Sequence, residues 1–539
     1  DDRINENRIY DESEYDEIWG HRREKHRYWG ETAKRTEFGS VVQAYCRNRS
    51  TDREITHYQK TKAIVPAYDD GGVIGSKIAL FGCPKPEVLN TIGEIEVAEG
   101  LPHPTINGEW MKTSQDVYFS YVITRFGVDN IDDIIETVKE TGLKAIYHPG
   151  PFENWGQFDL DKKEFPNNWE SMKECVEKAS KAGLLIGVHT LSNFVTTNDA
   201  YVTPKPDHRL AAFGPSPLTK DINATATEIP VKKEEWFSFK NTLNTVRIGD
   251  ELIQYEGITE TAPFKLTGCK RGAFGTTASA HKKDEIVHKL MDHGYGVFLT
   301  NTELTIEMAQ TLAKFVNETG VRVMAFDGLE GAWSTGMGTY GRSLFVENWF
   351  KTLNKDKQNG TLNMASNPDH FNWHINTRFG WGDESGSLRD GQTNYRVMNQ
   401  PFFARNYFPL FLGGFKITKE TAATEAEWFL ARAAGFNAGF NIMLDAVNEI
   451  KNNTDGDKIL FAINEWEKAR LSGAFPFELK ELLQNPEHDF HLEVIEPGKW
   501  KLYSVPDPLN NPGEMGGFIT IPLAETEKEK AIRKFKAQY

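Results

Sequence analysis

Three stretches of the chain combine the hydrophobic spacing of an amphipathic helix with a short apolar run. Apolar residues three and four positions apart predict a helix, closed by a glycine, before each of the runs 143–148, 184–190 and 321–326. An apolar run of this length between two helices is typical of a strand buried in a parallel sheet. The pattern therefore predicts three consecutive helix–strand units.

Polar side chains stand at the end of each of these predicted strands. His148 ends the first strand, His189 lies at the end of the second, and Asp327 directly follows the third. Because parallel strands that alternate with helices present their carboxyl ends at the same edge, we expect these three residues at one end of one sheet. We interpret the fold as α/β: a (β/α)8 TIM barrel with an inserted small β module and flanking β-rich domains.

Further apolar runs complete the predicted barrel. The strand that opens the barrel, before these three, is expected at 117–124, and a final amphipathic helix is expected at 458–471. The fifth to the eighth strands are expected at 361–366, 374–378, 407–412 and 439–444. No clear helix pattern separates the sixth strand from the seventh. The predicted catalytic barrel therefore covers residues 116–475.

The regions outside the barrel are rich in short β segments. Turn residues between such segments set 215–290 apart as an inserted module, which either shapes the rim of the barrel mouth or is a passive decoration. Its string Arg271-Gly-Ala-Phe-Gly-Thr, with His281 downstream, resembles small β modules of phage tail proteins and of some glycan-degrading enzymes. Residues 1–115 are expected to form an N-terminal β-rich region and connector, and 476–539 part of a C-terminal β-sandwich.

Composition narrows the classes of partner. A net charge of −15 without a basic stripe argues against nucleic acid. No apolar run reaches the length of about 20 residues that a membrane span needs. The four cysteines lack metal-ligand spacing, so buried thiols are expected. An aromatic content of 12%, with 13 Trp, favours stacking on sugar rings, although a large core would use the same residues. The oligomeric state stays open.

The carboxylates that follow the predicted strand 321–326 are the first candidates for catalysis. Asp327 is shielded at the top of its strand, where an acid can attack or stabilise an anomeric carbon, and Glu330 follows three residues later. Alternatively, Asp327 caps the turn at Gly328. His148 and His189 are candidate acid–base residues, hydroxyl ligands or metal ligands, or else histidines of the core.

Two further segments supply candidate substrate-binding groups. The first follows the strand that ends at His148, and its candidates are Tyr147, Glu153 and Trp155. The second is the cluster 372–384, whose candidates are Trp373, Arg378, Trp381, Asp383 and Glu384. The indoles would stack on sugars, the guanidinium would grip a uronic acid carboxylate, and either acid would complete a glycosidase pair. Alternatively, this cluster is a solvated loop anchored by Trp packing.

One pocket at the C-terminal face of the barrel is expected to collect these side chains. Its expected lining is Tyr147, His148, Trp155, His189, Asp327 and Trp381, with the inserted module at its rim. No zinc, Walker, Rossmann or nucleophile-elbow signature is present. We therefore expect no cofactor and no catalytic metal. Structural calcium, and a metal site made of His148, His189 and Asp327, stay open.

The strand-end residues resemble those of large carbohydrate-active enzymes secreted by glycan-degrading bacteria, over roughly residues 117–470. Asp327 is similar in position to the nucleophile of α-galactosidase-like and α-glucosidase-like retaining barrels, although the Lys-x-Asp pattern of their strand is absent. The chain also resembles lyases that release a terminal rhamnose from glucuronate. That second resemblance implies proton abstraction by Tyr147, His148 or His189 and charge neutralisation by Arg378.

Three functions follow as expectations. The first is an exo-acting glycoside hydrolase on side chains of plant or algal polysaccharides, and the second is a polysaccharide lyase that cleaves by β-elimination. The third is a non-catalytic glycan-binding protein with Trp155, Trp373 and Trp381 as platforms. For each we expect an oligo- or polysaccharide ligand. We also expect a periplasmic or extracellular location in a bacterium, with the signal peptide lying outside this sequence, because Asp1-Asp2-Arg3 does not begin one.

Overall fold

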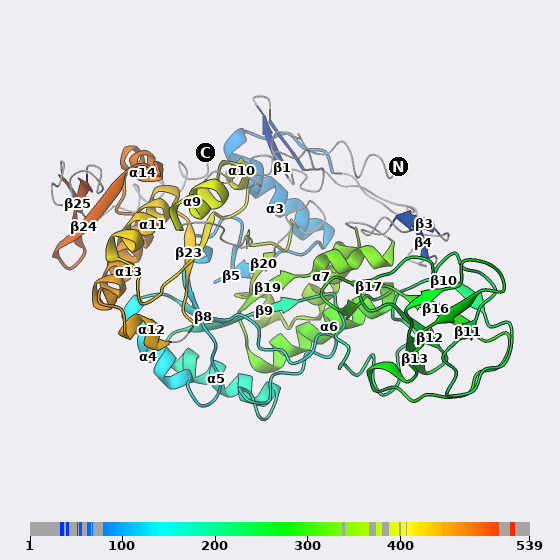
Figure 1. Cartoon of the computed structure of the whole chain (residues 1–539). Helices are drawn as coiled ribbons and strands as arrows, with labels where there is room; N and C mark the ends of the chain where they lie inside the picture. The colour runs from blue at the N-terminus through cyan, green and yellow to red at the C-terminus, as the bar shows by residue number, and fades with distance from the viewer. Residues whose placement is uncertain are drawn as a thin grey trace.

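The structure is a computed structural model, shown in Figure 1. It describes residues 33–36, 39–42, 51, 53–56, 62–65, 67, 79–336, 340–365, 373–379, 388–397, 400–405, 407–445, 447–505 and 518–522. Within these ranges, no helix is both long enough and apolar enough to cross a membrane.

Eight parallel strands form the centre of the molecule. They are β7 (Tyr121–Ile123), β8 (Ala145–His148), β9 (Leu185–Leu191), β19 (Val323–Asp327), β20 (Leu362–Ala365), β21 (Arg378–Phe379), β22 (Phe411–Lys416) and β23 (Gly439–Met443). Their hydrogen-bonded order is β21-β20-β19-β9-β8-β7-β23-β22, which is the chain order closed on itself with β23 beside β7. This is the cyclic order of a TIM barrel. The α/β barrel expected from the sequence is confirmed.

Helices alternate with these strands and cover the outside of the sheet. They are α4 (Ile131–Thr141), α5 (Trp169–Lys181), α6 (Thr302–Thr319), α7 (Tyr340–Thr352), α8 (Lys355–Gln358), α11 (Ala423–Phe436), α12 (Val447–Lys451) and α13 (Gly456–Leu471). In α4 the buried residues follow helical spacing, and Gly142 ends the helix with φ 69°. In α6 the side chain of Asn301 caps the first turn by accepting the N–H of Leu304 at 2.9 Å.

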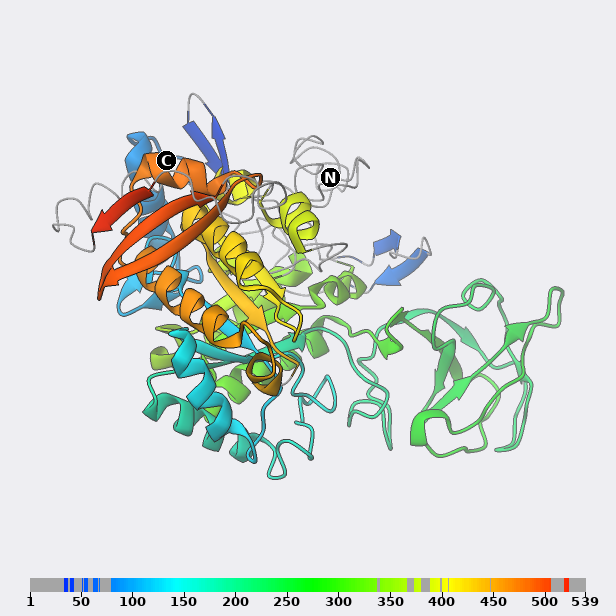
Figure 2. The same cartoon turned by 60° about the vertical axis from the view of Figure 1, so that its left-hand side comes forward.

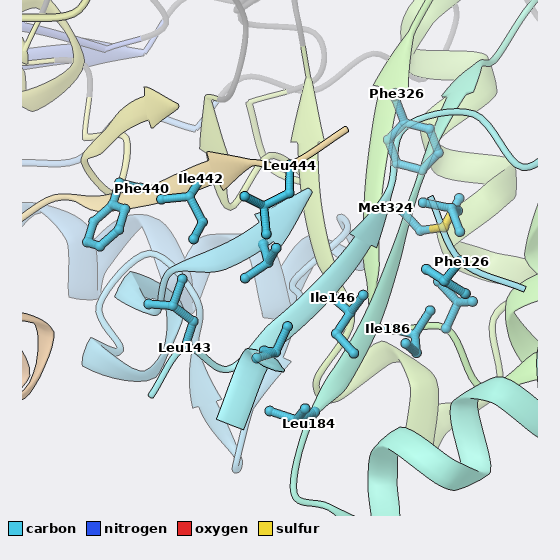
Figure 3. Close-up of a cluster of buried hydrophobic side chains, with 14 of the residues drawn as sticks. Phe126, Leu143, Ile146, Leu184, Ile186, Met324, Phe326, Phe440, Ile442 and Leu444 are labelled. Atoms are coloured by element: carbon cyan, nitrogen blue, oxygen red, sulfur yellow. The ribbon is translucent and has the colours of Figure 1, made fainter. Parts of the chain in front are cut away.

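Buried side chains form one layer on the inner face of the barrel sheet and a second layer on its outer face. The outer layer contains Ile146, Ile186, Met324 and Phe326, which pack between sheet and helices (Figure 3). The inner layer gathers side chains of five strands: Tyr121, Ala145, Tyr147, Val323, Leu362, Met364 and Phe411. Since successive residues of a strand point to opposite faces, these layers fix which strand-end residues face the barrel axis.

Three of the predicted strands differ in position from the observed ones. The residues expected to open the first strand form a 3₁₀ turn, η2 (Gln115–Tyr118), before β7 begins. The sixth strand starts only at its last expected residue, Arg378, and the seventh starts four residues late at Phe411. Between them lie α9 (Leu388–Gly391), the π-helical η5 (Gln392–Val397) and α10 (Gln400–Arg405). Tyr407, with φ 57°, sits in a turn that excludes it from a strand.

The inserted module is an all-β unit, as the sequence predicted. It contains β10 (Ala212–Pro217), β11 (Ile229–Pro230), β12 (Thr245–Ile248), β13 (Glu251–Gln254), β14 (Gly257–Ile258), β15 (Lys265–Thr267), η3 (Ala273–Gly275) and β16 (Ile286–Leu290). A hairpin of β17 (Asp292–His293) and β18 (Val297–Phe298) leads back toward α6. Figure 1 shows this module beyond the C-terminal ends of β9 and β19. Its core includes Phe194, from the segment that follows β9.

Smaller β elements flank the barrel. On the N-terminal side lie β1 (Ala33–Thr36), β2 (Gly39–Val42), β3 (Arg53–Thr56), β4 (Lys62–Val65), η1 (Lys85–Glu87), α3 (Val88–Glu99), β5 (Thr105–Ile106) and β6 (Glu109–Trp110). On the C-terminal side lie α14 (Phe477–Gln484), β24 (Asp489–Glu496), β25 (Lys499–Val505) and β26 (Phe518–Pro522). The last three strands form one antiparallel sheet, visible in Figure 2. Phe490 and Trp500 join it to the barrel's outer layer.

Candidate active site

Asp327 and His189 face each other inside the barrel mouth. His189 alternates with the outward residues Ile186 and Val188 of β9, and Asp327 follows the outward Phe326 of β19. Both side chains therefore point toward the barrel axis. Nε2 of His189 lies 3.5 Å from Oδ2 of Asp327, and each side chain is about one-third exposed. The structure thus brings together two of the three strand-end residues.

The backbone holds the carboxylate of Asp327 from below. Gly328, with φ 74°, turns the chain so that its N–H donates to Oδ1 of Asp327 at 2.9 Å. The carbonyl of Asp327 accepts the N–H of Ser192 at 2.6 Å. Asp327 therefore does cap the turn at Gly328, as the alternative interpretation proposed. That bond uses Oδ1, while Oδ2 is the oxygen nearest His189.

Tyr147 lies on the inner face beneath this pair. Its ring packs against that of Tyr121 with centroids 5.4 Å apart, and Tyr121 in turn stacks on Phe411 at 5.6 Å. Burial, together with the nearby Tyr121 and the charge of Asp327, raises the pKa of Tyr147 well above its usual value. The phenol therefore stays protonated and can donate a hydrogen bond to a ligand in the mouth.

Glu330 is the second carboxylate of this cluster. It lies in the 3₁₀ segment η4 (Leu329–Thr335), one turn after Asp327. Its Oε2 is buried, with no hydrogen-bond partner among the residues described by the structure. Burial raises the pKa of Glu330, and the charge of Asp327 raises it further, while Arg342 partly opposes the shift. Glu330 is thus a carboxyl group biased toward the protonated form, and it lies beside Asp327, whose Oδ1 accepts the backbone N–H of Gly328.

His148 lies in the outer layer of buried side chains. This differs from the expectation that it lines a pocket at the barrel mouth. His148 lies two residues after Ile146, which faces outward, so strand alternation directs His148 toward the helices as well. Its ring is fully buried, 5.0 Å from that of Phe126, and Nε2 lies 3.1 Å from Glu164. Burial lowers the pKa of His148 despite the neighbouring carboxylate. These surroundings make it a satisfied core histidine.

The side chain of Arg378 is directed toward the N-terminal end of the barrel, away from the strand ends where Asp327 lies. It begins β21, and its Nη1 donates to the carbonyls of Val117 at 3.2 Å and Phe119 at 2.7 Å, which precede β7. Its guanidinium packs over the rings of Phe119, Tyr121 and Phe411. Burial lowers its pKa to about 10. The guanidinium of Arg378 is therefore not placed to bind the carboxylate of a uronic acid at the barrel mouth, as the sequence analysis expected.

Trp373 belongs to the same lower end of the barrel. It is fully buried, with its ring 6.2 Å from Trp110 and Nζ of Lys112 lying 4.2 Å from its centroid. Helix α3 joins this cluster through Val88 and Ile92. Trp373 thus packs the N-terminal segment against the barrel, and no face of its ring is open to a sugar.

The other predicted residues lie in loops. Glu153 and Trp155 belong to the segment that joins β8 to α5, at the same end of the barrel as Asp327; Glu153 is exposed and Trp155 half-buried. Trp155 packs against both the barrel core and the module core. Trp381, Asp383 and Glu384 lie outside the described residues.

Lys416 and Asp445 are mouth residues that the sequence analysis missed. Lys416 is the last residue of β22. Asp445 follows β23, and its carboxylate forms an ion pair with Lys416. The rule that polar residues follow strand ends fits Asp445, which comes directly after the predicted eighth strand, although we did not apply it there; Lys416 was missed because the seventh strand was placed four residues too early. Within the described ranges, no group of three or more His, Cys, Asp or Glu side chains is arranged to hold a metal ion.

Comparisons with known proteins give only distant resemblances. No protein-family model matches the chain, and no curated protein matches it. The α-galactosidase of Lactobacillus brevis aligns at 11% identity over 72% of this chain and 44% of that enzyme, with a TM-score of 0.39. The α-amylase of Geobacillus thermoleovorans aligns at 12% identity over 73% and 85%, with a TM-score of 0.38. The α-galactosidase of Thermus thermophilus aligns at 10% identity over 84% and 79%, with a TM-score of 0.36.

These values identify no family. The match spans less than half of the Lactobacillus brevis enzyme. The assignment of the fold therefore rests on the strand order of the barrel, and the function must be argued from the residues of the mouth.

Proposed function

We propose that the protein is a glycoside hydrolase whose active site is the barrel mouth around Asp327. The observation that supports this most is the contrast between two neighbouring carboxyl groups. Oδ1 of Asp327 accepts a backbone N–H, whereas burial and the charge of Asp327 raise the pKa of Glu330. Glycoside hydrolysis requires one carboxyl group that gives a proton and a second one beside it, and a raised pKa suits Glu330 to the first part.

Each group has a defined part in this proposal. Glu330 gives its proton to the glycosidic oxygen as the bond from that oxygen to the anomeric carbon breaks. Asp327 stabilises the positive charge that develops on the sugar, either as an ion or by a covalent bond to the anomeric carbon. Water then supplies hydroxide to the anomeric carbon, and its remaining proton restores Glu330. Tyr147 and His189 hold sugar hydroxyls beside Asp327.

We propose side chains of plant or algal polysaccharides as substrates, attacked from a chain end. The support is the position of the inserted module, whose core continues through Phe194 to the segment behind Asp327. A wall on one side of the mouth favours a chain end over a continuous polymer. Such substrates imply action in the periplasm or outside the cell.

The lyase alternative finds less support at this mouth. A lyase needs a cation to neutralise the uronate and a base to remove a proton from carbon. The guanidinium of Arg378 is buried against the carbonyls that precede β7, and the raised pKa of Tyr147 opposes the anionic form that a base requires. The non-catalytic alternative loses Trp373 as a platform because that ring is buried.

Product chemistry separates the three functions in one experiment. The purified protein is incubated with a panel of plant and algal polysaccharides, which carry no aromatic leaving group, and both new reducing ends and ultraviolet absorbance are followed. Hydrolysis gives reducing ends without absorbance, whereas elimination gives an absorbing unsaturated uronate. Absorbance that rises in step with the reducing ends would overturn the proposal in favour of a lyase. No product from any substrate would favour a binding protein.

A further inference from the structure

Tyr295 is an exposed aromatic side chain at the tip of the β17–β18 hairpin. Its side chain is 62% exposed, although the residues around it belong to the packed module. Gly296, with φ 71°, makes the turn that returns the chain to β18. An exposed Tyr that lies in a turn is ordinary by itself. What distinguishes Tyr295 is the way its ring is held.

Two other rings pack against that of Tyr295. Its centroid lies 4.5 Å from that of His293 and 5.9 Å from that of Phe194, and the Phe194 and His293 rings stack at 4.7 Å. Phe194 is fully buried. Burial lowers the pKa of His293, which favours the neutral imidazole in this stack. The arrangement restricts the Tyr295 ring before any ligand arrives, which reduces the entropy lost on binding.

The backbone of the hairpin is also fixed. Val195 and Phe298 exchange two backbone hydrogen bonds, of 2.9 and 2.8 Å, which tie β18 to the segment after β9. At the other strand, the Asp292 carboxylate accepts the N–H groups of Thr242 at 3.1 Å and Leu243 at 2.8 Å. The hairpin therefore keeps one position relative to both the module and β9.

This supporting stack reaches the backbone next to the two candidate catalytic carboxylates. Ring atoms of Phe194 lie 3.0 Å from the place where a Cβ would stand on Gly328, and 3.0 Å from that place on Gly331. Gly328 directly follows Asp327, and Gly331 directly follows Glu330. Only glycine lets the ring approach so closely at both positions. Phe194 thus links the backbone behind the carboxylates to the ring of Tyr295.

We propose that Tyr295 is the stacking platform of a second sugar subsite, which binds the pyranose next to the one that is cleaved. The apolar C–H face of a pyranose suits an aromatic face, and the phenol hydroxyl suits its equatorial hydroxyls. The inference rests on the proposed function because it takes the cleaved sugar to lie at Asp327. It adds the substrate class: an oligosaccharide of at least two sugars rather than a single sugar on an arbitrary leaving group.

The test compares long and short substrates in Tyr295→Ala. For the oligosaccharide, KM should rise roughly tenfold, the ratio that about 1.4 kcal/mol of lost contact produces, while kcat stays within about twofold. For an aryl monoglycoside, which fills only the cleavage position, both constants should stay at wild-type values. Tyr295→Phe should recover most of the affinity because the ring remains. Phe477→Ala, which removes an exposed ring on α14, is the matched control.

Calorimetric binding of the same oligosaccharide separates this inference from the proposed function. A wild-type protein that binds but never hydrolyses, with roughly tenfold weaker binding in Tyr295→Ala, would remove the function and leave the subsite. Equal dissociation constants for wild type, Tyr295→Ala and Phe477→Ala would overturn the subsite, even if hydrolysis is normal. Wild-type turnover of the monoglycoside by Tyr295→Ala shows that the variant is folded.

Discussion

Nε2 of His189 lies 3.5 Å from Oδ2 of Asp327, across the neighbouring parallel strands β9 and β19. The two residues come from helix–strand units more than a hundred positions apart, and the inserted module lies between them in sequence. Strand pairing sets this relationship, because it aligns His189 with Ala325, two residues before Asp327 on the same face. The barrel therefore holds the pair rigidly, as a catalytic arrangement requires.

The first prediction concerns His189. Replacing it with Ala should lower kcat about 10²-fold, because the substrate loses a polar group placed beside the reacting carboxylate. Steady-state kinetics on the best aryl glycoside measures this effect. His208→Ala is the control, since that side chain is 84% exposed. Equal rates in the two variants would show that His189 takes no part in turnover.

The second prediction concerns the acid role of Glu330. In Glu330→Gln no proton can be given to the leaving oxygen, so alkyl glycosides should react about 10²- to 10⁴-fold more slowly. Dinitrophenyl glycosides need little protonation and should retain most of their rate. A measured series of leaving groups gives the dependence directly. A uniform loss across the series would assign the acid role to another residue.

The third prediction concerns stability and pH at Glu330. Its pKa in the folded protein is raised above the ordinary value of 4.5, so the folded state binds this proton more tightly than the unfolded state. Stability is therefore lost as the pH rises from about 4.5 through the raised pKa. Glu330→Gln, which cannot ionise, should have a higher Tm than wild type at neutral pH, and the difference should vanish in acid. Thermal unfolding across pH tests this, and a lower Tm for the variant at neutral pH would contradict it.

The fourth prediction separates Arg378 from substrate recognition. Arg378→Ala leaves two backbone carbonyls without their donor and opens a cavity under three rings, so it should destabilise the fold by about 2–4 kcal/mol. The ratio of kcat/KM for uronate-bearing and neutral substrates should not change. Denaturant unfolding and paired kinetics measure the two effects. Selective loss of uronate substrates would return Arg378 to the active site.

Part of this fold and site was predictable from the sequence, because apolar runs mark buried strands whichever way their side chains point. The runs at β8, β9 and β19 gave the barrel, and the rule that polar residues follow strand ends located His189 and Asp327. The same rule misplaced His148. In a strand buried on both faces, hydrophobicity does not show which residues face the axis.

Arg378 and Lys416 show a second limit. A cation next to tryptophans has the same sequence pattern whether it lines a pocket or seals the lower end of a barrel. Only the hydrogen bonds of Arg378 to the carbonyls of Val117 and Phe119 decide between them. Lys416 was missed because the turn at Tyr407, with φ 57°, moves the seventh strand. Strand boundaries of this kind depend on tertiary packing, which local patterns do not encode.

If the carboxylate of Asp327 carries out the chemistry, removing its charge must abolish most of the turnover. The variant Asp327→Asn keeps the size of the side chain but removes the charge, whereas Asp457→Asn makes the same change at an exposed position of α13. On a substrate that wild type hydrolyses, the account predicts at least about 10³-fold lower kcat for Asp327→Asn and unchanged kcat for Asp457→Asn, with both variants folded. Near wild-type kcat in Asp327→Asn would contradict the account.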